Sequence, residues 1–407
     1  MTQIATGVFK QLIAKKQSAL GSAASGASAQ LYRRVTSTLD LKKATYKSNE
    51  IRPSMQRADM RHGIRSVDGT ISGELSVGTY QAFIGSVLRN AWASVSAYAA
   101  GIDVTAQATS PQFSDASGGF LAAGLKVGMV GRWTGFAGSP GSNNNNKNFL
   151  ITVLTDTDMT GVFLNGDAVA ADAAGDSVTF TPVGKYCSIP TTGHTRDYWT
   201  IEHNFADITQ SEQFTDCVFG DMNVKLPPTG MATIDFPIKG LNMTTGTTSV
   251  FTSPSAASTG ATLAAVNGAV YVQGIAVAQI TGLDFSIKGN LTTPGGVVGS
   301  NVDPDIFPGA IDVEGNMTVL FSDATMRDYF LNETEVSIVT CFTSGISATA
   351  DFQSHIFHRV KLGGANKGDG EKGLTMTVPF TALENTAGGT NKSSFATTYW
   401  VQDSAAT

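Results

Sequence analysis

The stretch that decides the fold runs Asp68-Gly-Thr-Ile-Ser-Gly-Glu-Leu-Ser-Val-Gly-Thr-Tyr-Gln-Ala-Phe-Ile84. Its first half alternates apolar or small residues with polar ones, which is the period of a half-buried β-strand. From Tyr80 the apolar residues recur at the spacing of one helical face: Tyr80, Phe83, Ile84, Val87, Leu88 and Trp92. The stretch therefore predicts a strand followed directly by an amphipathic helix that packs on the sheet, capped by Ser76 or Thr79.

The same pattern returns 246 residues later as Glu314-Gly-Asn-Met-Thr-Val-Leu-Phe-Ser-Asp-Ala-Thr-Met-Arg-Asp-Tyr-Phe330. One Gly, one Ser and one Thr are identical, and Met326, Tyr329 and Phe330 repeat the helical spacing. Other blocks recur in the same order: Leu39-Asp-Leu41 with Leu283-Asp-Phe285, Val224-Lys-Leu226 with Val360-Lys-Leu362, and 232–241 with 374–383. Blocks that keep their order indicate one module present twice.

The last of these blocks predicts a β-hairpin. Residues 222–226 and 233–238 alternate as strands do, and a Pro-Pro-Thr-Gly turn lies between them. In the second copy the connection, residues 363–373, is longer, which a hairpin loop tolerates. Each module is therefore expected to be a β-sheet with one packed helix.

The duplication also predicts the domain organisation. The first module is expected at 31–95 plus 206–243 and the second at 265–407, with a linker at 244–264. The first copy is about 110 residues longer than the second between matching blocks, so 96–205 is read as an insertion containing a small β-barrel-like domain. Residues 1–30 form an N-terminal arm in this interpretation. Below, the first module denotes 31–95 plus 206–243, and the second module denotes 265–407.

Charge is scarce and unevenly distributed. Only 15% of the 407 residues are charged, against about 25% in typical soluble domains, which suggests surfaces shared with other subunits. No apolar run approaches the roughly 20 residues that span a bilayer, and no secretory signal is recognisable, so no membrane association is expected. Residues 1–66 carry a net charge of +9 and the remainder −15. Such a basic segment can bind nucleic acid or dock on the acidic body of another copy, and we favour the second.

Residues that could carry chemistry are scattered. Cys187, Cys217 and Cys341 form no metal or disulfide pattern and are expected to be buried thiols. His355 and His358 lie in a predicted strand, where they point to opposite faces, so they are expected at a surface or interface. His62, His194 and His203 are interpreted as interface or loop residues. We expect no cofactor, no metal site and no enzymatic activity.

With the duplicated blocks in view, the chain resembles the tail tube proteins of bacteriophages with long, non-contractile tails, and most of all those whose tube fold is duplicated within one chain. The resemblance covers about 30–95, 195–245 and 265–403, and it suggests a Chi-like phage that uses the host flagellum. It implies a mainly β fold of β-sandwich tail-tube modules, each with a flanking α-helix, plus the inserted β domain.

The resemblance also implies a function and partners. Tail tube modules join with their neighbours into a β-barrel around a lumen, and the rings stack into a tube that conducts the genome. Six modules per ring are usual, so a two-module chain implies a trimeric, pseudo-hexameric ring, with a hexamer of whole chains as the alternative. The implied partners are other copies, the tape-measure, tail terminator and tail-tip proteins, and phage DNA in transit without specific binding. The implied location is the virion tail.

Two segments are expected to make the contacts between rings, because arms and long loops do so in that family. One is the N-terminal arm, through Phe9, Lys10, Leu12, Ile13, Lys15 and Lys16; the other is a long hairpin or loop at 42–66, through Lys47, Arg52, Arg57, Arg61 and Arg65. A different possibility is a carbohydrate-binding or adhesin-type virion protein that uses the inserted domain, although Trp133 and Phe136 are the only obvious aromatic platform there.

Overall fold

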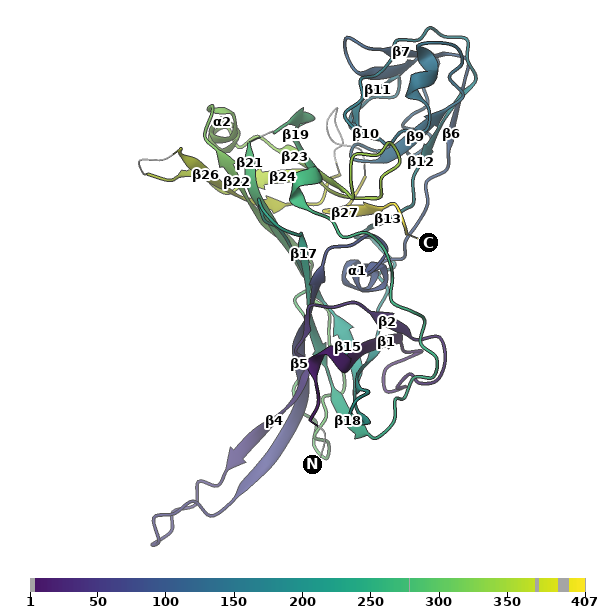
Figure 1. Cartoon of the computed structure of the whole chain (residues 1–407). Helices are drawn as coiled ribbons and strands as arrows, with labels where there is room; N and C mark the ends of the chain where they lie inside the picture. The colour runs from purple at the N-terminus through teal and green to yellow at the C-terminus, as the bar shows by residue number, and fades with distance from the viewer. Residues whose placement is uncertain (1–3, 278, 370–372, 387–394, 407) are drawn as a thin grey trace.

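The computed structural model describes residues 4–277, 279–369, 373–386 and 395–406. These residues form a 20-stranded and a 7-stranded sheet and two α-helices, and the strands pair antiparallel. The expectation of a mainly β fold is thereby confirmed. Figure 1 shows an elongated molecule, with the seven-stranded sheet at one end and a long hairpin projecting from the other.

Eight strands form the centre of the large sheet, in the spatial order β4–β5–β17–β16–β21–β22–β26–β24. The first four belong to the first module and the last four to the second. Strand β16 pairs with β21, with Val224 opposite Phe285, so the two modules share one continuous sheet. The strands are β4 (Asp40–Lys47), β5 (Met60–Glu74), β17 (Thr233–Gly240), β16 (Asp221–Leu226), β21 (Ile280–Lys288), β22 (Asp312–Leu320), β26 (Thr375–Ala382) and β24 (Phe352–Leu362).

The repeated blocks of the two modules have matching strand registers. Thr70 of β5 lies opposite Pro237 of β17, and the matching Asn316 of β22 lies opposite the matching Pro379 of β26. On its other side, β17 pairs with β16 before Pro237 and with β15 (Gln210–Phe219) after it. In the same way, β26 pairs with β25 (Asn366–Lys367) before Pro379 and with β24 after it. A residue without an N–H is tolerated at such a gap in the ladder.

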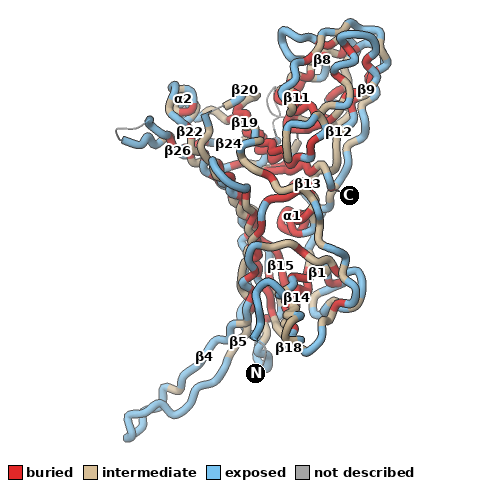
Figure 2. Tube along the Cα trace, in the orientation of Figure 1, coloured by how far each residue is buried: buried red, intermediate tan, exposed pale blue. Residues whose placement is uncertain are grey.

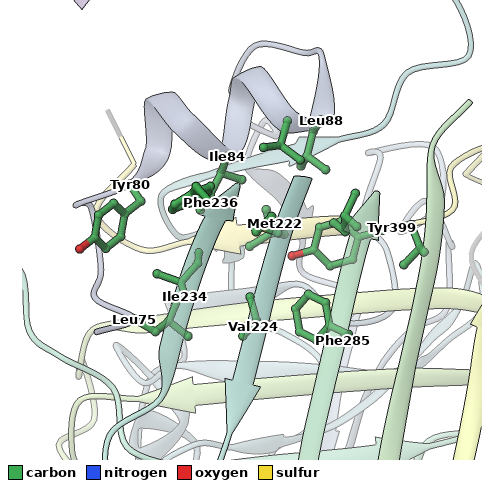
Figure 3. Packing of buried hydrophobic residues seen from close by; sticks show 14 of the residues in the cluster. Leu75, Tyr80, Ile84, Leu88, Met222, Val224, Ile234, Phe236, Phe285 and Tyr399 are labelled. Atoms are coloured by element: carbon green, nitrogen blue, oxygen red, sulfur yellow. The ribbon is translucent and has the colours of Figure 1, made fainter. Parts of the chain in front are cut away.

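Helix α1 (Gln81–Leu88) packs against β15 and β16 of the first module. Figure 3 shows its residues Ile84 and Leu88 above Phe236, Met222 and Tyr399. Neither Ser76 nor Thr79 caps it, so that prediction is wrong: the Ser76 hydroxyl instead donates a hydrogen bond to Thr79 Oγ1. The matching helix α2 (Thr325–Leu331) contacts β24 of the second module.

The chain's beginning is part of the sheet as well. Strand β1 (Lys10–Lys16) pairs with β2 (Gln30–Tyr32) and with β14 (Trp199–Phe205), which in turn pairs with β15. Strand β18 (Asn242–Gly246) lies on the other side of β15, and β3 (Thr36–Ser37) pairs with β5. The remaining strands of the large sheet are β13 (Lys185–Ser188), β19 (Gly268–Val272), β20 (Ile275–Ala276), β23 (Val336–Thr343) and β27 (Trp400–Asp403).

Within 96–205, strands β6 to β12 form a separate seven-stranded sheet in the order β6–β12–β9–β10–β11–β8–β7, whereas β13 and β14 belong to the large sheet. The core of the seven-stranded sheet includes the buried side chains of Phe113, Trp133 and Phe149, and the same cluster continues into the second module. The Gln402 side chain bonds both backbone groups of Val130, so the insertion is docked on β27. The strands of the seven-stranded sheet are β6 (Tyr98–Gly101), β7 (Val104–Gln107), β8 (Gln112–Asp115), β9 (Val130–Thr134), β10 (Phe149–Leu154), β11 (Asp158–Phe163) and β12 (Val178–Pro182).

Candidate assembly surfaces

The long hairpin is the most exposed part of the described chain. Strands β4 and β5 continue past the body, and Figure 2 shows the projecting part exposed along its length. Residues 49–62 are all exposed, including the apolar Ile51 and Met55 near the tip. A two-stranded ribbon with so little packing is marginally stable in water, which favours a role in contact with another molecule.

The basic side chains predicted for this contact lie along the hairpin. Lys47, Arg52, Arg57 and Arg61 are exposed. Arg52 pairs with Glu50 at 2.9 Å and Arg61 with Asp59 at 2.8 Å. Exposed ion pairs of this kind contribute only about 0–1 kcal/mol, so these arginines can exchange their partners for carboxylates of another chain.

Arg65 has a different place from the other four. It lies at the base of the hairpin, where its guanidinium donates to the side-chain oxygens of Asn242 at 2.8 Å and Asn301 at 2.9 Å. These bonds tie β5 to β18 and to the segment before β22. Arg65 thus fixes the base from which the hairpin projects.

The N-terminal segment divides into a buried and an exposed part. Leu12 and Ile13 of β1 are buried in the chain's own core. Phe9, which precedes the strand, is exposed together with Ile4 and Val8. In the described part of this segment, the exposed large apolar side chains therefore all precede Lys10.

The lysines of this segment are engaged within the chain. Lys10 Nζ donates to the Ser37 carbonyl at 2.9 Å, and Lys15 Nζ donates to the Ala27 carbonyl at 2.6 Å. Lys16 forms an ion pair with Asp197 at 2.8 Å. These contacts hold β1 against its neighbours, and the contact of Lys10 with Ser37 places the start of β1 beside β3.

The two helices are packed to different degrees. Tyr80, Phe83, Ile84 and Leu88 of the first module are buried, and the Phe83 ring stacks 4.3 Å from Tyr32 and 4.2 Å from Phe219. In the second module Met326 is buried, Tyr329 is half-buried and Phe330 is exposed.

Two of the histidines lie in the core of the second module. His355 and His358 are on strand β24, as predicted, but both are buried, so their expected place at a surface or interface is wrong. The Tyr399 hydroxyl lies 2.7 Å from His355 Nδ1, and Trp400 Nε1 donates to His358 Nε2 at 2.6 Å. These aromatic partners come from just before and within β27, and their hydrogen bonds offset the cost of burying the two imidazole rings.

His203 is also a core residue, not an interface or loop residue. It lies on β14, buried, with its Nε2 2.7 Å from the Ser37 hydroxyl and its ring against Phe214. The three cysteines are free and buried, as expected. The described residues contain no group of three or more His, Cys, Asp or Glu side chains placed to hold a metal ion.

Burial of the histidines predicts an acid-sensitive stability. Desolvation lowers the pKa of His358 to about 3, with a smaller effect from Lys126. An unfolded chain binds a proton there below pH about 6.5, whereas the folded chain does not. Stability should therefore fall as the pH drops from about 6.5 toward 3. We expect the replacement His358→Gln, which keeps an acceptor for Trp400, to flatten this dependence in urea unfolding.

Two other buried groups with shifted pKa values also affect the pH dependence, so the variant must be compared with wild type. Burial also lowers the pKa of His355 to about 3, which acts in the same direction. Burial raises the pKa of Asp403 to about 6, so the folded chain binds a proton there between pH about 4 and 6, which acts in the opposite direction. Both groups persist in His358→Gln. An unchanged difference in stability between the two proteins from pH 7 to pH 4 would contradict the prediction.

The chain is thus built of sheet modules joined edge to edge, with an exposed basic hairpin projecting from one end. A family model described as phage tail tube protein matches residues 10–382, and the chain belongs to this family. It is accordingly a structural component of a bacteriophage tail, and the predicted family and location are confirmed. Among the curated proteins compared with the chain, none matches. Within the described residues, neither helix is long and apolar enough to cross a membrane.

Proposed function

We propose that this chain assembles into rings of three copies, and that the rings stack into the tube through which the phage genome leaves the virion. The observation that supports this most is the junction inside the chain. Strand β16 of the first module pairs with β21 of the second over six residue pairs, from Asp221–Lys288 to Leu226–Leu283. The modules are thereby joined head to tail, and a head-to-tail contact closes into a ring when its rotation allows.

The strands needed to repeat this junction are at the two ends of the central sheet. Among the described strands, β4 pairs only with β5, which leaves its outer edge open. At the other end, β23 accompanies β24 only as far as Val360, so Lys361 and Leu362 pair on one side alone, with β26. An open edge is a template for pairing with another chain. In the ring, the edge of β24 in one copy would pair with the edge of β4 in the next, as β16 pairs with β21 within one chain.

Stacking is assigned to the hairpin. It projects past the sheet in the direction of its own strands (Figure 1), and it carries the exposed basic residues Lys47, Arg52, Arg57 and Arg61. The rest of the chain beyond residue 66 has a net charge of −15. Opposite charges favour the approach of the hairpin to the body of a copy in the neighbouring ring.

The same acidic charge suits a conduit. DNA passes without sticking if the wall does not offer cations to its phosphates. The tape-measure, tail terminator and tail-tip proteins are the further partners proposed for the ends and the interior of the tube. The rival adhesin function loses its main support, because Trp133 and Phe136 are buried in the inserted domain and form no exposed platform.

Mass and shape of the purified protein test the proposal. We expect light scattering after gel filtration to show a species of three times 42.4 kDa, and negative-stain images to show rings or tubes with a central hole. A ring of six chains would overturn the stoichiometry and keep the function. Dispersed monomers at the highest attainable concentration would overturn the proposal itself.

A further inference from the structure

The matching helices of the two modules are unequally covered. In α1 the residues from Phe83 to Leu88 are all buried. In α2 only Met326 is buried, while Phe330 is 37% and Leu331 is 65% exposed. Both helices pack on their own module's sheet, but α1 is also covered by Tyr32, Phe219 and Trp199, and the second module contacts it at both ends.

The second module contacts helix α1 at both of its ends. Its neighbour β13 pairs with β27, and the backbone N–H of Gly78, just before the helix, donates to Asp403 of β27. At the other end Arg89 donates to the carbonyls of Gly289 and Gly309, which flank β21 and β22. Figure 3 shows Leu88 above Tyr399. The helix of the first module is thus held at both ends by the module that follows it in the sheet.

Helix α2 has apolar neighbours that are also uncovered. A hollow of about 330 Å³ lies between α2, β20 and β22, lined by Ile275, Leu320, Met326 and Tyr329 among others. Ile275 and Leu320 are themselves exposed. A contiguous exposed apolar surface on a soluble chain marks an interaction site. We call Ile275, Leu320, Tyr329, Phe330 and Leu331 the α2 face.

A matching surface lies at the opposite end of the chain. The exposed apolar residues Ile4, Val8 and Phe9 precede β1, and Val35 directly precedes β3. Arg34 joins the two segments, because it donates to the carbonyls of Gly7 and Lys10. The two segments lie at the end of the first module at which the outer edge of β4 is open. Residues 4–35 hold five basic residues and no acidic one, whereas 323–335 around α2 hold four acidic residues and one basic. The two surfaces are therefore complementary in both polarity and charge.

We propose that the α2 face is the seat for the first module of a second copy, whose residues 4–9 and Val35 lie against α2. In this contact the next module in the ring packs on α2 between chains, as the second module contacts the ends of α1 within a chain. It rests on the proposed ring and adds to it the residues by which one chain recognises the next. It also gives the N-terminal segment a partner within the same ring.

Substitution of Leu331 tests the seat. Its exposure means that Leu331→Asp should leave folding intact, which a thermal melt within a few degrees of wild type would verify. We expect the concentration at which rings form to rise at least about tenfold, as for loss of an interface anchor. The matched control is Ile346→Asp, on the loop between β23 and β24, because Ile346 is 81% exposed and lies outside the α2 face. This variant should assemble like wild type.

Cross-linking locates the partner. Cysteines placed at Leu331 and Val8 should join chains through a short bismaleimide, whereas cysteines at Ile346 and Val8 should not; the native cysteines are buried. If wild type forms rings and Leu331→Asp forms them equally well, the seat is refuted and the proposed function stands. Equal cross-linking of the control pair also refutes the seat. If wild type forms no rings, the proposed function fails and the seat fails with it.

Discussion

Deleting residues 44–64 and joining Lys43 to Arg65 through an Asn-Gly turn should give a folded chain that no longer makes stable tubes. Lys43 and Arg65 lie directly opposite each other in the β4–β5 ladder, so a two-residue turn can close the shortened hairpin. Arg65 and its two asparagine partners are kept. The removed residues contribute almost nothing to the core, so we expect a thermal midpoint near that of wild type and the loss of nearly all tubes in electron micrographs, with single rings persisting.

Two variants, one with three substitutions and one with two, separate the effect of the hairpin's charges from that of its apolar tip. The triple replacement of Arg52, Arg57 and Arg61 by Gln removes the cations, and Ile51→Ser with Met55→Ser removes the apolar side chains while the charges stay. If charge pairing stacks the rings, the first variant should assemble poorly at low salt and lose the salt dependence of wild type, since exposed charges are screened over about 10 Å. Tubes of normal length from the deletion variant would show that the hairpin does not join rings.

The second large effect is expected at Phe83. Its ring is fully buried between Tyr32, Phe219 and Trp199, with centroid distances of 4.3, 4.2 and 5.4 Å. Phe83→Ala should lower the free energy of unfolding by about 3–5 kcal/mol, because a large cavity opens where the surrounding rings cannot collapse. Urea unfolding of the unassembled chain measures the change.

The duplication supplies the control. Tyr329 occupies the position of α2 that Phe83 occupies in α1, but it is half-buried. Tyr329→Ala should cost about 1 kcal/mol, the usual size for a substitution with modest burial. Equal losses at the two positions would mean that α2 is packed as firmly as α1, contrary to the structure.

Much of the fold follows from the repeated sequence. Aligning the two copies predicts that Pro237 and Pro379 take equivalent places, and the structure sets them opposite the equivalent Thr70 and Asn316. The strands and the helix can be predicted because the spacing of apolar residues depends only on residues that are close together in the sequence. The second hairpin departs from the first, since β25 lies in its longer connection and shifts the pairing of β24 with β26.

Other features depend on partners far along the chain and leave no local signal. The pairing of β1 with β14 joins residues about 190 positions apart. The histidines of β24 read as polar in the sequence, yet the hydrogen-bond partners that offset the cost of their burial, Tyr399 and Trp400, come from more than 40 residues away. The sequence also gives no sign that the α2 face is exposed, because the apolar spacing of 326–330 is that of any packed helix.

The β16–β21 junction has a consequence for the kinetics of tube growth. Because the two modules are tethered, this junction forms at an effective concentration set by the linker rather than by the amount of protein in the cell. In a three-chain ring, half of the six module junctions would then exist before any two chains meet. Only three chains have to collide for closure instead of six, which lowers the order of the nucleation step and makes ring formation less sensitive to dilution.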